Sequence, residues 1–153
     1  MKNLAFAACA LVLALAACGP EAQTPAPGPG APALALQALS GADIEGRLGG
    51  ELGCSFTANG DVLLVAMGDV NPGAYSEALI RREGEVLLLP ALSAGGYDAM
   101  VETAAFATGA MSAAVQTGAR NQTGDEQVEH SATLTVRADG AERAYDGVWT
   151  CGP

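Results

Sequence analysis

Turn signals divide the chain from about Ser40 to Pro153 into short apolar runs, at intervals of roughly eight to twelve residues. Asn59-Gly60, Glu83-Gly84 and Asp139-Gly140 each stand between two such runs. Asparagine, aspartate and glycine tolerate the positive φ angles that a two-residue hairpin turn requires. This spacing favours consecutive hairpins over βαβ units. The sequence therefore predicts an all-β fold, either a small antiparallel β-barrel or a sandwich.

Three stretches give the clearest strand predictions, and a fourth is expected to open the sheet. Residues 61–67 form a buried apolar run, and residues 128–137 alternate between an apolar face and a polar face. Residues 141–151 return along that strand and place Trp149 and Cys151 on one face. Ile44 to Leu48 is the expected opening strand.

Two other stretches are harder to assign. Tyr97 to Phe106 is alanine-rich, which allows a helix, but its flanking glycines suit a strand, and we favour the strand. Thr117 to Gln127 is polar, and we expect it to be a loop.

The N-terminus differs in character from the rest of the chain. Lys2 precedes an unbroken apolar run from Leu4 to Ala16, which is too short to span a bilayer comfortably. The run ends in Leu15-Ala16-Ala17-Cys18, with two small residues directly before the cysteine. The pattern predicts a signal peptide that is cleaved from the chain.

This segment resembles the signal of bacterial lipoproteins, in which a lipobox precedes a cysteine that takes a diacylglycerol. The resemblance implies that Met1 to Ala17 is removed and that Cys18 becomes the acylated N-terminus. Two or three acyl chains, palmitate among them, would anchor the protein in the bilayer without a transmembrane helix. Gly19 stands where an aspartate often marks inner-membrane retention. The expected location is therefore the outer membrane, facing the periplasm.

Residues 18–39 are expected to be the acylated cysteine and a disordered Pro/Gly/Ala-rich linker, followed by a β-domain over residues 40–153. Proline fixes φ and removes a hydrogen-bond donor, so most of this linker cannot build a helix or a ladder. Its last part, Leu34 to Leu39, is more apolar and suits either a short helical turn or a first strand at the domain edge.

Charge limits the range of partners. Lys2 is the only lysine, so the mature chain keeps six arginines against all 17 acidic residues. So acidic a surface repels nucleic acid and anionic lipid head groups, and permits a basic protein as partner. No small-molecule substrate is evident from the sequence.

Two cysteines remain after processing. Cys9 lies in the segment that is removed and Cys18 is acylated, which leaves Cys54 and Cys151 in an oxidising compartment. Each stands on the apolar face of its predicted strand, beside an aromatic residue. We therefore predict one structural disulfide between Cys54 and Cys151.

The sequence contains no recognisable catalytic, cofactor or metal constellation. His130 is the only histidine, and it falls within a predicted strand. No serine has a nucleophile-elbow context, and no phosphate-binding glycine loop occurs. We expect no enzyme activity, no cofactor and no metal.

A stretch of the domain resembles the membrane-bound inhibitors of c-type lysozyme, which are small bacterial lipoproteins with an antiparallel β-barrel. The family carries a loop with a serine four residues before a tyrosine, a spacing kept here by Ser93 and Tyr97. Ala94 replaces the glycine that follows the serine in that family, and the mature chain has no lysine for the inhibitor site. The resemblance implies a binding loop at Ser93 and Tyr97.

The functional prediction is a cell-envelope lipoprotein that serves as a non-catalytic binding or structural module. The alternative is an inhibitor of a secreted hydrolase such as c-type lysozyme.

Overall fold

The structure is a computed structural model that describes residues 34–109, 111–122 and 126–153. The predicted signal peptide, Cys18 and the linker up to residue 33 lie outside the described residues. The elements, in chain order, are β1 (Leu36–Gln37), α1 (Gly41–Ile44), β2 (Leu52–Ala58), β3 (Asp61–Gly68), β4 (Glu77–Arg82), β5 (Glu85–Pro90), α2 (Gly96–Glu102), β6 (Thr103–Thr108), β7 (Met111–Gln122), β8 (Val128–Ala138) and β9 (Ala141–Gly152).

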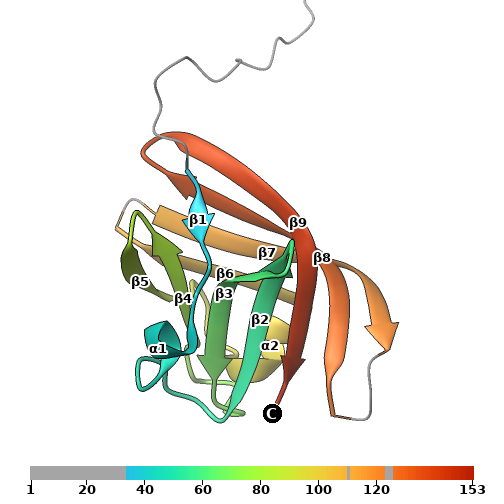
Figure 1. Cartoon of the computed structure of the whole chain (residues 1–153). Coiled ribbons are helices and arrows are strands. Elements are labelled where there is room, and N and C mark those ends of the chain that lie inside the picture. Colours follow the sequence, from blue (N-terminus) through green and yellow to red (C-terminus); the bar gives the residue numbers. More distant parts are fainter. Residues whose placement is uncertain (1–33, 110, 123–125) are drawn as a thin grey trace, which may run out of the picture.

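All strand pairs are antiparallel, and together they form one strongly curled sheet, a half-barrel (Figure 1). Strands β2 to β5 form one meander and β6 to β9 form a second. The outer strands of the two meanders approach at a bridge between Ala91 and Phe106. The predicted all-β antiparallel fold is confirmed.

Pairing between β2 and β9 joins the two meanders. Cys54 lies directly opposite Cys151 in this ladder, and Phe56 lies opposite Trp149. The two cysteines form the predicted disulfide, which links positions 97 residues apart. Gly147 follows on the same inward face, where a Cβ would lie 2.3 Å from Thr57 O and 2.8 Å from the Phe56 ring. Only glycine therefore lets the two strands pack this closely around Phe56.

The core fills the inside of the curled sheet. Its largest fully buried side chains are Trp149, Phe56 and Phe106, surrounded by aliphatic residues from every strand from β2 to β8. The indole Nε1 of Trp149 donates a hydrogen bond of 2.8 Å to the backbone oxygen of Met100 on α2. A buried indole N–H needs such a partner, so this bond fixes the helix against the end of the core.

The three predicted hairpin turns are present. Asn59, Glu83 and Asp139 each adopt a φ between 53° and 55°, and each is followed by a glycine with positive φ. Two consecutive positive φ values define the type I′ turn, whose twist matches that of the flanking strands. Local sequence preference accounts for the turns at Asn59-Gly60 and Asp139-Gly140, whereas a positive φ is uncommon for a glutamate such as Glu83.

The prediction of a strand over Tyr97 to Phe106 is wrong in its first half. Residues 96–102 form helix α2, and only residues 103–108 continue as a strand. Met100 points from the helix into the core, where its backbone oxygen accepts the Trp149 bond. The helix fits the open end of the sheet, a requirement that the flanking glycines do not reveal.

The predicted strand at Ile44 to Leu48 is also wrong. The chain forms the short helix α1 over residues 41–44, followed by turns. Ser40 N donates to the Asp43 carboxylate at 2.8 Å as part of a capping box, and Ser40 Oγ donates to the same carboxylate at 2.7 Å. These bonds, together with the Arg81 guanidinium, lower the pKa of Asp43. The Ser40–Asp43 spacing thus starts a helix before any strand can begin.

The prediction of a loop over Thr117 to Gln127 is wrong for residues 117–122, which are strand, and residues 123–125 lie outside the described residues. β7 continues to Gln122 and pairs with β8, with Arg120 opposite His130 and a register shift after Thr117. Thr117 Oγ1 donates to Glu102 O, and Asn121 Nδ2 donates to Glu129 Oε1. Backbone pairing with β8 stabilises this polar segment, although it contributes little to the core.

The folded domain includes the last part of the predicted linker. Leu34, Leu36 and Leu39 are buried, and β1 pairs with the last two residues of β4. The Tyr145 hydroxyl donates to Leu34 O at 3.1 Å and accepts from Leu36 N at 2.8 Å. Of the two alternatives for this stretch, the strand at the domain edge is the observed one.

The disulfide is expected to contribute a large share of the stability. Replacing both cysteines, C54A with C151A, removes a cross-link that closes a loop of about 100 residues, and should lower the free energy of unfolding by about 4–5 kcal/mol. Urea denaturation of residues 34–153 can be followed by the emission of Trp149, the single tryptophan. The control is the unsubstituted domain with a reductant, which should approach the midpoint of the double variant. Equal midpoints for the variant and the oxidised domain would contradict the expectation.

Candidate functional site

Two loops lie side by side at the end of the half-barrel where β3 and β5 end. They are residues 69–76, between β3 and β4, and residues 91–95, between β5 and α2; we refer to them as the paired loops. Two backbone hydrogen bonds connect them, from Gly95 N to Ala74 O at 3.0 Å and from Ala91 N to Ser76 O at 2.8 Å. Two more join the start of α2 to the first loop, from Gly96 N to Ala74 O at 3.0 Å and from Tyr97 N to Asp69 O at 2.8 Å. The loops are therefore held in one arrangement relative to each other.

Glycines permit this close approach. Gly96 has a φ of +56°, and a Cβ at this position would lie 2.2 Å from Asp69 O and 2.6 Å from Asn71 O. The buried Ser76 hydroxyl donates to Gly96 O at 2.9 Å, and it occupies the space where a Cβ of Gly68 would lie. Without a side chain at Gly96, the two backbones meet and exchange their hydrogen bonds.

Ser93 and Tyr97, the residues predicted to form a binding loop, have different environments. Ser93 is exposed. Tyr97 is half-buried and packs against the hydrophobic core. Burial, and to a lesser extent the Asp98 carboxylate, raises the pKa of the Tyr97 phenol. Of the two side chains, only that of Ser93 is fully available at the surface.

The paired loops also carry most of the large apolar side chains that are exposed within the described residues. Val70, Tyr75 and Leu92 are 57%, 63% and 64% exposed, and they are three of the four large apolar side chains that are exposed within the described residues. The fourth, Leu88, is 41% exposed and lies on β5. Sequence reasoning missed these three residues. The available signal was the presence of large apolar residues inside glycine- and proline-rich turn segments.

A groove of about 550 Å³ runs beside the paired loops, between α2 and the strands β6 and β7. Asp98 and Glu102 line it from α2, four residues apart and therefore on one face of the helix. Ser93 stands at its edge, and small side chains, including Ala99 and Ala105, line much of the remainder. The groove therefore combines an uncharged, small-residue lining with two carboxylates.

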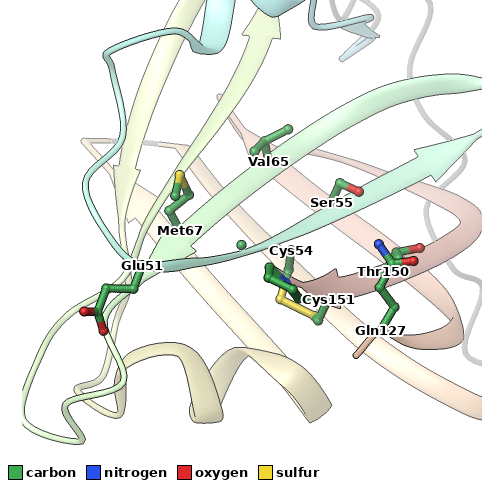
Figure 2. A pocket seen from close by; sticks show the side chains of 11 residues that line it. Glu51, Cys54, Ser55, Val65, Met67, Gln127, Thr150 and Cys151 are labelled. Atoms are coloured by element: carbon green, nitrogen blue, oxygen red, sulfur yellow. A yellow bond between two sulfur atoms is a disulfide. The ribbon is translucent and has the colours of Figure 1, made fainter. Parts of the chain in front are cut away.

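A second hollow, of about 300 Å³, lies on the outer face of β2, β3 and β9 beside the disulfide. Figure 2 shows Val65 and Met67 contributed by β3, with Ser55 and Thr150 on the neighbouring strands. Glu51 stands at its border, and its side chain points away from the disulfide (Figure 2). The hollow is wide open and offers apolar atoms and hydroxyls.

Within the part of the chain that the structure describes, no cluster of three or more histidine, cysteine or acidic side chains could hold a metal ion. His130 is half-buried on β8, opposite Trp149 on β9. Within the same residues, no helix has the length and apolar character required to cross a bilayer.

Comparisons with protein-family models, with curated proteins and with solved structures found no match for the chain.

The close approach at Gly96 gives a test of the paired loops. Gly96→Ala places a methyl group against the Asp69 and Asn71 oxygens. This contact should lower the free energy of unfolding by about 1–3 kcal/mol, in addition to the cost of placing an alanine at positive φ. The matched control is Gly109→Ala, because Gly109 has a φ of +52° and nothing within 4 Å of the added carbon. Urea denaturation compares the two variants. Equal losses would show that the loops do not depend on this contact.

Proposed function

We propose that the protein is a bacterial cell-envelope lipoprotein, acylated at Cys18, whose β-domain is a non-catalytic binding module. The proposed location is the outer membrane, with the domain facing the periplasm. The lipobox Leu15-Ala16-Ala17-Cys18 and the proline-rich residues that follow it support the anchor. The acidic charge and the exposed apolar side chains of the paired loops support binding to another protein.

One observation carries the proposal: the chain enters the domain at the end opposite to the paired loops. Leu34 is held by Tyr145, and β1 pairs with Arg81 and Arg82, where β4 ends. The paired loops lie where β4 begins (Figure 1). An anchor that precedes Leu34 would therefore attach at the end opposite to the paired loops and leave them unobstructed for a partner in the periplasm.

The anchor is tested by replacing Cys18. In the bacterium that produces the protein, the full chain should fractionate with membranes, and its mature N-terminal peptide should carry acyl chains by mass spectrometry. Cys18→Ala should prevent acylation, so that the chain leaves the membrane fraction or stays unprocessed. Cys9→Ala is the matched control and should change neither result. A soluble mature chain with an unmodified Cys18 would refute the anchor.

A second candidate function is inhibition of a secreted hydrolase such as c-type lysozyme. The observation that favours it is the exposed Ser93 on a hydrogen-bonded loop, at the edge of a groove with two carboxylates. A loop held by hydrogen bonds loses little conformational entropy when it enters an enzyme cleft.

A lysozyme assay with residues 34–153 tests this second function. Inhibition is expected at micromolar protein, and Ser93→Arg should weaken it at least about tenfold because the larger cation would meet a basic enzyme. Ser55→Arg, on the outer face of β2, is the control and should leave inhibition unchanged. Absence of inhibition by the unsubstituted domain at micromolar concentration would exclude the function.

A further inference from the structure

The exposed apolar side chains of the paired loops are suited to a protein interface. Scattered apolar side chains are normal on a surface, but Val70, Tyr75 and Leu92 belong to two loops that are hydrogen-bonded to each other. Tyr75 lies between Ala74 and Ser76, which both accept hydrogen bonds from the neighbouring loop. Exposed aromatic and aliphatic side chains on a preorganised backbone are the usual anchors of protein interfaces.

The charges around this surface specify the partner. The paired loops contain Asp69 and no lysine or arginine, and α2, which follows them, contributes Asp98 and Glu102 to the adjacent groove. A second copy of the chain would bring the same acidic groups to the interface, and like charges oppose that contact. Nucleic acid and anionic lipids are repelled for the same reason. A protein with a basic surface is attracted.

We propose that Val70, Tyr75 and Leu92 form a docking surface for a basic protein of the periplasm, and that the groove beside it receives a lysine or arginine side chain of that partner. The apolar side chains supply the contact area, and Asp98 and Glu102 select the charge. This inference rests on the proposed binding function and adds to it the docking surface and the chemistry of the partner.

The experiment uses the full chain in the bacterium that produces it, with a photoreactive benzophenone side chain as the probe. The probe replaces Leu92 in one variant and Leu88 in another. Leu88 is the matched control, because it is also an exposed leucine but lies outside the paired loops. Irradiation should give one protein adduct at position 92 that is absent at position 88, and mass spectrometry should identify a basic protein.

Purified components then test the chemistry of the adduct. Binding of the identified protein to the unsubstituted domain should weaken as salt is raised. Tyr75→Asp and Leu92→Asp should each raise Kd at least about tenfold, and Leu88→Asp by less than about twofold. Asp98→Asn with Glu102→Gln should reduce both the affinity and its salt dependence. Emission from Trp149 checks that every variant is folded.

The inference is overturned if the adduct at position 92 contains a second copy of the chain, a lipid or an acidic protein. It is also overturned if positions 92 and 88 give equal adducts, or if position 92 gives no protein adduct. The same probes in a Cys18→Ala chain separate the two proposals. An adduct that forms whether or not the chain is membrane-bound supports the docking surface independently of the anchor. A membrane-bound chain without an adduct refutes the docking surface and leaves the anchor standing.

Discussion

The pairing of β2 with β9 is the contact on which the rest of the structure depends. Each four-stranded meander is built from local hairpins, but neither encloses a core alone. The β2–β9 ladder joins them, places Phe56 opposite Trp149, and brings Cys54 and Cys151 into the disulfide. The largest fully buried side chains of this core are Trp149, Phe56 and Phe106, so its stability depends strongly on these few large side chains and on the cross-link.

The same core positions the candidate site. Trp149 donates its indole N–H to Met100 O and so holds α2 at the end of the half-barrel. Because α2 begins at Gly96, its position also fixes the loop before it, and Tyr97 N reaches Asp69 O on the neighbouring loop. The exposed side chains of the paired loops are therefore presented by a backbone that is tied to the protein interior.

Sequence reasoning succeeded where the determining interactions are local and failed where they are not. Asn59-Gly60 and Asp139-Gly140 specify their hairpins through backbone preference alone, and the alternation along residues 128–137 identifies the buried face. Residues 117–122 form a strand only because β8 offers backbone partners. At the candidate site, Ser93 lies in one of the paired loops, but Tyr97 lies on α2 and packs inward. Val70 and Tyr75 belong to a loop that the sequence does not connect with it.

The sequence by itself determined the antiparallel hairpins, the inward faces of the main strands and the cysteine pair, because these follow from φ preferences, two-residue periodicity and the small number of available thiols. Only the tertiary structure decided that residues 96–102 form a helix and that residues 69–76 meet residues 91–95. Those outcomes depend on the space left at the end of the core and on hydrogen bonds between distant segments, which no local pattern encodes.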